Sequence, residues 1–186
     1  MAVVIRSRAM TPKAKLFWLM LLISLPLDQL TKQWIIRNFH YGEVQEVIPG
    51  IFDLTYVRNP GGAFSFFASG PFEQRMAFFI GTTAVAVVLL AFFYRKLEPQ
   101  AKLSAFSLGM ILGGALGNLI DRLVYTEVID FLDVHLWSGY TWPTFNLADS
   151  FIVVGVILLM VETFFAEQPG GEGPREPVES EDANPA

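Results

Sequence analysis

Apolar residues occur in four long stretches, separated by more polar segments of unequal length. A helix needs about 20 mostly apolar residues to cross a bilayer. The stretches that approach this length cover residues 16–36, 76–94, 103–120 and 151–166. The second has no charged residue, whereas the first is interrupted by Asp28, Gln29, Lys32 and Gln33. The pattern predicts a membrane protein of the all-α class with four transmembrane helices.

An alternative interpretation of the first stretch is a cleavable signal peptide, because four basic residues precede the apolar run 16–27. No cleavage site of the A-x-A type follows that run, and polar residues continue at helical spacing instead. The first stretch is therefore predicted to be retained as a helix.

Basic residues are distributed unevenly around the four stretches. Four precede the first stretch, and Arg95, Lys96 and Lys102 lie between the second and third, whereas only Arg122 lies between the third and fourth. Cytoplasmic loops carry the excess of Lys and Arg. This predicts a basic cytoplasmic N-terminus (1–15), a membrane domain (16–166) and a cytoplasmic C-terminus, with the segments 37–75 and 121–150 on the far side of the membrane.

The far-side segment 37–75 is too long for a simple connection between helices. Its part EVQEVIPGIFDLTYVRN has β-branched and aromatic residues on both sides of a Pro-Gly pair. That pattern is typical of short strands joined by a turn, and the following NPGGAF (59–64) is typical of a loop. A small β portion is therefore predicted on the far side.

Composition supports membrane location and separates the tail from the body. The chain is 53% hydrophobic and only 17% charged, and its mean hydropathy is +0.44. Its net charge of −5 lies in residues 167–186, which hold six acids and one base, so the body is neutral. The Gly-, Pro- and Glu-rich tail is predicted to be disordered.

Two classes of chemistry are not supported by the composition. The chain lacks the excess of basic residues that is typical of nucleic-acid-binding proteins. It has no cysteine, which excludes disulfides and thiolate chemistry.

The third stretch combines small residues with a polar end. Gly109, Gly113 and Gly117 recur at every fourth position and line one helix face, where they favour close helix packing. Asn118, Asp121 and Arg122 follow, and a carboxylate near a helix C-terminus opposes the helix dipole. These polar residues are interpreted as part of a buried network at the membrane surface, with a solvated helix end as the alternative.

Two further aspartates lie in the same far-side region. Asp130 has apolar neighbours in VIDF, and Asp149 lies in FNLADS just before the fourth stretch. Either Asp149 or Asn146 could act as a helix N-cap, which is the structural alternative. If Asp130 and Asp149 meet at a partly dry site, they cannot both ionise easily and will share a proton. Such a pair can activate water with one carboxylate and protonate a carbonyl with the other.

Asp28 and Lys32 are four residues apart and can pair on one helix face. Ionisable residues within a span usually mark function, although a structural ion pair is the alternative here. The two histidines, His40 and His135, are far apart in sequence. The sequence therefore predicts no zinc site and no other metal or cofactor.

Together these residues resemble the lipoprotein signal peptidases, also called signal peptidase II. Five blocks match the motifs of that family in order, over about residues 15–166. The blocks are DQLTK (28–32), NPGGAF (59–64), GNLIDR (117–122), VIDF (128–131) and FNLADS (145–150).

The resemblance implies an aspartic endopeptidase of the bacterial inner membrane, without cofactor, whose site faces the periplasm. It implies that the enzyme cleaves diacylglyceryl-modified prolipoproteins on the amino side of the lipidated cysteine. Asp130 and Asp149 would be the catalytic pair. The implied supporting and substrate-positioning residues are Asp28, Lys32, Asn59, Gly61, Asn118, Asp121, Arg122 and Asn146. The far-side strands would form a cradle beside the membrane.

The substrate implied by the resemblance is itself lipidated, so the site should open to membrane lipid. Aromatic residues are candidates for the entrance or for interface anchors: Phe64, Phe66, Phe67, Phe131, Trp137 and Trp142. A monomer is expected. Two other functions remain open from the sequence, namely a small ion-coupled transporter with an aspartate relay, and a non-enzymatic membrane subunit assembled through the glycine face.

Overall fold

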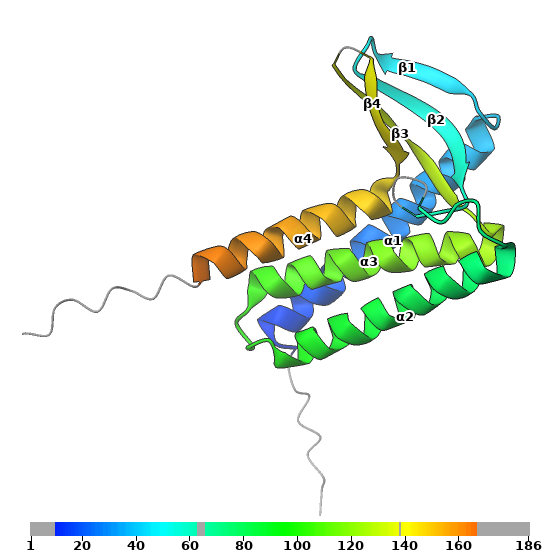
Figure 1. The fold of residues 1–186 in the computed structure, drawn as a ribbon. Coiled ribbons are helices and arrows are strands. Elements are labelled where there is room, and N and C mark those ends of the chain that lie inside the picture. The colour runs from blue at the N-terminus through cyan, green and yellow to red at the C-terminus, as the bar shows by residue number, and fades with distance from the viewer. Residues whose placement is uncertain (1–9, 63–65, 138, 167–186) are drawn as a thin grey trace, which may run out of the picture.

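The computed structural model describes residues 10–62, 66–137 and 139–166. These residues form four α-helices and four β-strands (Figure 1). The helices are α1 (Pro12–Asn38), α2 (Phe72–Lys96), α3 (Lys102–Tyr125) and α4 (Leu147–Ala166). The strands are β1 (Val44–Ile48), β2 (Phe52–Asn59), β3 (Val128–Trp137) and β4 (Tyr140–Phe145). All four helices are long and apolar enough to cross a membrane, which confirms the predicted fold class.

Each predicted span lies within one helix, but the helices extend beyond the spans. Helix α3 continues to Tyr125 and ends where Thr126 takes a left-handed conformation, at φ 67°. Helix α4 begins at Leu147. An apolar stretch marks only the part of a helix that lies within the membrane. The polar last turn of α3 and first turn of α4 were therefore not predicted as helix. Asp121 and Asp149 therefore lie on helices, and the far-side connection 121–150 is shorter than expected.

Helix α3 is the central element of the bundle, and each of the other three helices packs against it. Helices α1 and α3 end at the same end of the bundle at which α2 and α4 begin, and the sheet lies at that end (Figure 1). The start of α1 and the end of α4 lie at the opposite end.

The strands form one antiparallel sheet in the order β1-β2-β3-β4. The predicted strands around the Pro-Gly pair are β1 and β2. Strands β3 and β4 were not predicted, although Leu132, Val134 and Leu136 alternate with polar residues in the manner of a half-buried strand. The β2–β3 pairing brings Val57 opposite Asp130. The sheet thereby places Asp130 at its bundle end.

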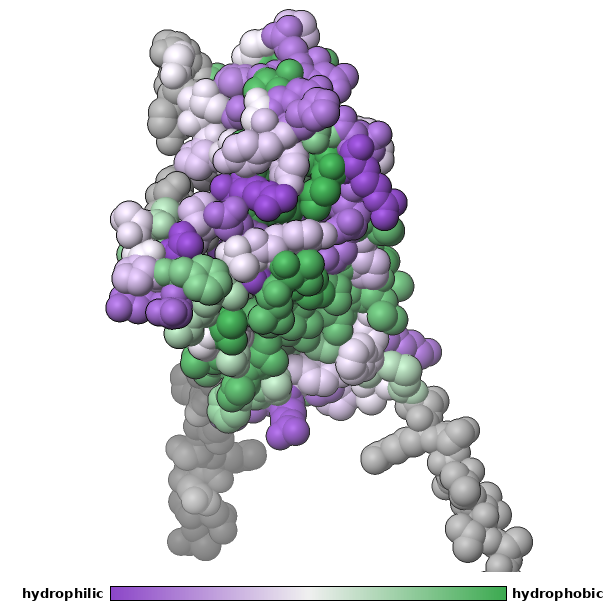
Figure 2. Space-filling model, turned by 90° about the vertical axis from the view of Figure 1, so that its right-hand side faces the viewer, coloured by the Kyte–Doolittle hydropathy of each residue, from purple (hydrophilic) through white to green (hydrophobic). Residues whose placement is uncertain are grey.

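The outer surface of the helices is apolar. Leu22 of α1, Val88 of α2 and Phe164 of α4 are each more than 60% exposed. Figure 2 shows this apolar surface as a band, with hydrophilic residues gathered mainly at the end that carries the sheet. Polar side chains that are buried lie instead between the helices or where the helices meet the sheet, and this arrangement suits a lipid environment.

Glycines of α3 allow its neighbours to approach closely. A Cβ atom at Gly113 would overlap the side chain of Ser24, and one at Gly117 would overlap the carboxylate of Asp28. On the α4 side, a Cβ atom at Gly114 would overlap the Ala148 carbonyl. The predicted glycine face is thus covered by α1 within the same chain, which removes the surface that the subunit hypothesis required.

Candidate active site

A single ammonium group lies at the centre of the buried polar network. Lys32 is 1% exposed, and its Nζ lies 2.9 Å from Asp28 Oδ2 and 2.8 Å from Asp121 Oδ2. It also donates to Asn118 Oδ1 over 2.9 Å. The three N–H groups of Lys32 therefore have three oxygen partners, from two helices, and the predicted Asp28–Lys32 pair is confirmed as a contact.

The two carboxylates around Lys32 each hold a second element in place. Asp28 Oδ1 accepts a hydrogen bond from the backbone N–H of Ala148, in the first turn of α4, over 2.9 Å. Such N–H groups lack partners within the helix, and a negative charge there is favourable. Asp121 Oδ2 accepts from the N–H of Ile129 in β3, over 3.1 Å. Gln29 joins the two by donating to both carboxylates.

Asn118 is oriented by this network. Its Oδ1 accepts hydrogen bonds from Lys32 and, over 3.2 Å, from Asn146 Nδ2. The amide nitrogen must then point the other way, and it donates to Asp149 Oδ1 over 2.8 Å. The charge on Lys32 thus determines which atom of Asn118 meets Asp149.

Asn146 and Asp149 form a reciprocal cap at the start of α4. The N–H of Asp149 donates to Asn146 Oδ1 over 3.0 Å, and the N–H of Asn146 donates to Asp149 Oδ2 over 3.3 Å. This has the geometry of a capping box. The capping alternative considered for these residues is therefore correct as local structure, and it leaves the Asp149 carboxylate beside Asn118.

Asp130 is 3% exposed and is held by two amide groups. Asn146 Nδ2 donates to its Oδ1 over 2.7 Å, and Asn59 Nδ2 donates to its Oδ2 over 3.0 Å. Asn146 therefore contacts both Asp130 and Asp149. Burial, together with the charge of Asp149, raises the pKa of Asp130 to about 7. A carboxyl group with this pKa exchanges its proton near neutral pH.

Arg122 and Gly61 connect the β2–α2 segment to α3. Arg122 Nη2 donates to the Gly61 carbonyl over 2.9 Å, and its guanidinium lies 4.3 Å from the centre of the Phe79 ring. The N–H of Gly61 donates to Asn59 Oδ1 over 2.9 Å. A Cβ atom at Gly61 would lie 2.6 Å from the Phe66 carbonyl, so glycine fits this position. The turn thereby fixes the amide that holds Asp130.

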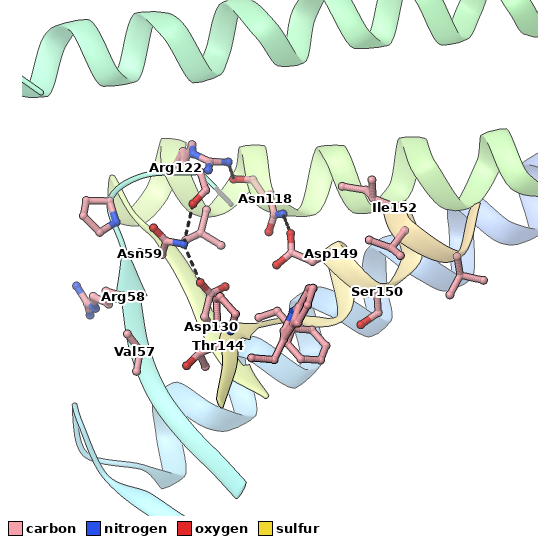
Figure 3. A pocket seen from close by; sticks show the side chains of 18 residues that line it. Val57, Arg58, Asn59, Asn118, Arg122, Asp130, Thr144, Asp149, Ser150 and Ile152 are labelled. Carbon is pink, nitrogen blue, oxygen red and sulfur yellow. Dashed lines mark hydrogen bonds between the residues drawn. The ribbon is translucent and has the colours of Figure 1, made fainter. Parts of the chain in front are cut away.

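The two aspartates border a cavity of about 900 Å³. Figure 3 shows Asp130 and Asp149 coming from β3 and α4, with Asn59, Asn118 and Arg122 around them. Another part of the wall is apolar and includes Trp142, Val153 and Val154. Val153 is 55% exposed and Val154 44%, so the cavity reaches the lipid-facing surface of α4.

All ten predicted site residues lie in this network or border the cavity. Gln29, one of the polar interruptions of the first span, also belongs to the network but was not predicted as a site residue. Arg58 and Ser150 line the cavity and were not predicted either. Arg58 lies outside the five motif blocks, whereas Ser150 is the last residue of FNLADS and directly precedes the fourth apolar stretch.

The aromatic candidates for the entrance behave differently. Trp142 lines the cavity. Phe131 is 4% exposed and packs in the core with Ile35 and Tyr56, so its prediction as an entrance residue is wrong. Phe66 and Phe67 contact Phe78 of α2 and do not line the cavity. Phe64 and the side chain of Trp137 lie outside the part of the chain that the structure describes.

Fold and site together define a multi-pass membrane protein whose buried polar network leads to two carboxylates at one cavity. The family model described as signal peptidase (SPase) II matches residues 20–165. The chain therefore belongs to the signal peptidase II family, as the sequence motifs indicated, and a protein of this family is a protease.

Relatives and solved structures agree with this assignment. The chain is 51% identical to the lipoprotein signal peptidase of Syntrophotalea carbinolica, over 78% of this chain and 90% of the relative. It is 48% identical to that of Geobacter sulfurreducens, over 86% and 98%. A solved bacterial membrane enzyme has 30% identity and a TM-score of 0.75, over 86% of this chain and 94% of that one.

The position of Lys32 generates a prediction about stability. Replacing it in Lys32→Met leaves Asp28 and Asp121 buried without their cation, and removing one member of a buried charge network costs about 3–5 kcal/mol. We expect a loss of this size in the free energy of unfolding, measured by denaturant titration of the detergent-solubilised protein. Lys102→Met, at an exposed position at the start of α3, is the matched control. Equal stability of the two variants would contradict this role of Lys32.

Proposed function

We propose that the protein is an aspartic endopeptidase that removes signal peptides from diacylglyceryl-modified prolipoproteins, on the amino side of the lipidated cysteine. The observation that carries the proposal is the position of Asn146, which contacts Asp130 and Asp149 at a cavity open toward lipid. Membership of the signal peptidase II family supports the reaction class. The names of the relatives support lipoprotein precursors as substrates.

The pair would divide the acid and base work. Since its raised pKa keeps a proton on Asp130 up to about pH 7, Asp130 would donate that proton to the oxygen of the scissile carbonyl. Asp149 would accept a proton from the attacking water, which adds to the carbonyl carbon. When the tetrahedral intermediate collapses, the proton on Asp149 passes to the departing amide nitrogen, and one hydroxyl group of the intermediate returns its proton to Asp130. This scheme uses two carboxylates and one water molecule.

The remaining site residues would position this pair. Asn59 and Asn146 donate to both oxygens of Asp130, so its proton must occupy a lone pair that faces the cavity or displace one of these bonds. Asn118 and the N–H of Asn146 hold Asp149. Lys32 acts through Asn118 and is a positioning residue, since its contacts are with Asp28, Asp121 and Asn118.

The shape of the cavity suits a lipidated peptide. Its polar wall holds the aspartates, and the apolar wall on α4 extends to exposed valines. We propose that the signal helix and acyl chains approach along α4 from within the bilayer, while water enters from the sheet end. A site at the end of the helices meets both requirements.

The distribution of basic residues supports an orientation with the sheet end on the periplasmic side of a bacterial inner membrane. Arg95, Lys96 and Lys102 lie at the opposite end of the bundle, near the start of α1. Residues 1–9 of the proposed cytoplasmic N-terminus (1–15), and the whole of the tail 167–186, lie outside the described residues.

Because α1 covers the glycine face of α3, intramolecular packing accounts for that face, and we propose that the enzyme acts as a monomer.

The first test removes each carboxylate in turn. Asp130→Asn and Asp149→Asn keep the side-chain size but remove the acid or the base, and general acid–base catalysis contributes about 10²- to 10⁴-fold. We expect each variant to cleave a diacylglyceryl-prolipoprotein at least about 100-fold more slowly, measured by the size shift on a gel.

Glu73→Gln is the matched control, because it removes an exposed carboxylate at the same end of the molecule, in the first turn of α2. It should cleave at the wild-type rate. If either Asn variant retains a rate near that of wild type, the assignment of the pair is wrong.

The second test uses pH. Because the scheme needs the proton on Asp130, kcat/KM should fall about tenfold per pH unit above the pKa of about 7. The measurement is the initial rate at low substrate between mildly acidic and alkaline pH, with recovery of activity on return to neutral pH as the control for denaturation. A rate that stays level or rises through this range would rule out Asp130 as the acid.

A further inference from the structure

A second group of ionisable side chains lies on the sheet, outside the cavity. Asp53 at the start of β2 pairs in register with Asp133 of β3, and His135 follows two residues after Asp133. Successive side chains of a strand point to opposite faces. Asp133 and His135 therefore lie on the face of β3 opposite to Asp130, and the proposed reaction does not use them.

The three side chains converge. One ligand atom from each lies within 4.8 Å of the others. His135 Nε2 is 2.9 Å from Asp53 Oδ2, and His135 Nδ1 is 3.0 Å from Thr141 Oγ1. When Nδ1 carries its proton toward Thr141, the lone pair of Nε2 is directed at the carboxylates. Metal-ligating histidines are commonly oriented by a hydrogen bond at the other ring nitrogen.

Hydrogen bonding within the group leaves two oxygens without partners. Only three buried side-chain polar atoms lack a hydrogen-bond partner in the described part of the chain, and two of them are Oδ1 of Asp53 and Oδ1 of Asp133. An ion pair between a protonated His135 and Asp53 would satisfy Asp53 Oδ2 alone. Buried oxygens without partners call for a further ligand, such as water or an ion.

The sheet register adds a third carboxylate to the row. Glu46 of β1 pairs with Asp53, which in turn pairs with Asp133, so three adjacent strands place an acid at the same level. Like charges directly opposite each other destabilise a sheet. A cation bound between the strands would remove that repulsion.

We propose that Asp53, Asp133 and His135 bind a divalent transition-metal ion, with Zn²⁺ as the representative ion. Imidazole nitrogen and carboxylate oxygen together suit Zn²⁺, whereas Ca²⁺ and Mg²⁺ prefer oxygen ligands alone. Water completes the coordination, with Thr141 as the residue that orients His135. The bound ion fastens β2 to β3 at the end of the sheet away from the helices.

The separation of His40 and His135 in the sequence predicts no zinc site, and the contact between Asp53 and His135 revises that expectation. Asp53 is 82 residues from His135 along the chain and reaches it through strand pairing alone.

The test is Zn²⁺ binding to the full chain without an affinity tag, in detergent, after treatment with a chelator and its removal. We expect one Zn²⁺ per chain by isothermal titration calorimetry. In Asp53→Asn and His135→Gln the affinity for Zn²⁺ should fall at least about tenfold. Substitution of a residue that only hydrogen-bonds to a metal ligand already lowers metal affinity by about 10- to 100-fold. His40→Gln, which removes the other histidine, is the matched control and should bind like wild type. Because the readout is binding alone, Asp130→Asn should also bind like wild type whether or not the proposed reaction is correct.

Two further measurements test the site without the Asp53 and His135 variants, in case those variants fail to fold. Zn²⁺ should raise the thermal unfolding midpoint of wild type and of His40→Gln, and X-ray absorption at the zinc edge should show one imidazole among oxygen ligands in both. The absence of stoichiometric binding in wild type, unchanged affinity in the Asp53 and His135 variants, or a zinc spectrum without imidazole in His40→Gln would each overturn the proposal.

Discussion

The arrangement of the site depends on one buried ammonium group. An ion removed from water is costly, and it is tolerated when each of its hydrogen-bonding groups has a partner. Lys32 meets this condition with three oxygens, and two of them belong to carboxylates that also accept a hydrogen bond from another element. Asp28 extends to the first turn of α4, and Asp121 extends to the start of β3. The elements that carry Asp149 and Asp130 are therefore fastened to the same charge.

Close packing of the helices makes this network possible. Gly117 leaves room for the carboxylate of Asp28 against α3, and Gly114 leaves room for the start of α4. In a lipid environment, polar groups need partners inside the protein. The polar ends of α1, α3 and α4 find these partners in one another and in the sheet. The same packing keeps the two aspartates beside the cavity, at the end of the bundle that carries the sheet.

The sequence was sufficient for the parts of the structure that local pattern controls. The apolar stretches predicted the four helices, and the spacing of Asp28 and Lys32 predicted their contact. Contacts between segments that are distant in the sequence could not be predicted in the same way. The motifs named Asn146 as a supporting residue, but not that it contacts both aspartates, because those bonds depend on how α4 meets β3. The approach of Asp53 to His135 required the β2–β3 register, and no local pattern specifies that register.

The proposed mechanism requires that Asp130 and Asp149 form a coupled pair and that the resting proton lies on Asp130. Infrared spectroscopy of protein with isotope-labelled aspartate tests it directly, because a protonated carboxyl group has its own C=O stretching band. In wild type we expect this band at a pH about one unit below 7. Its intensity should fall as the pH rises, with a midpoint near the pKa of about 7. In Asp130→Asn the band should be absent. A band that persists unchanged in Asp130→Asn, or no titrating band near neutral pH in wild type, would contradict the proposed mechanism.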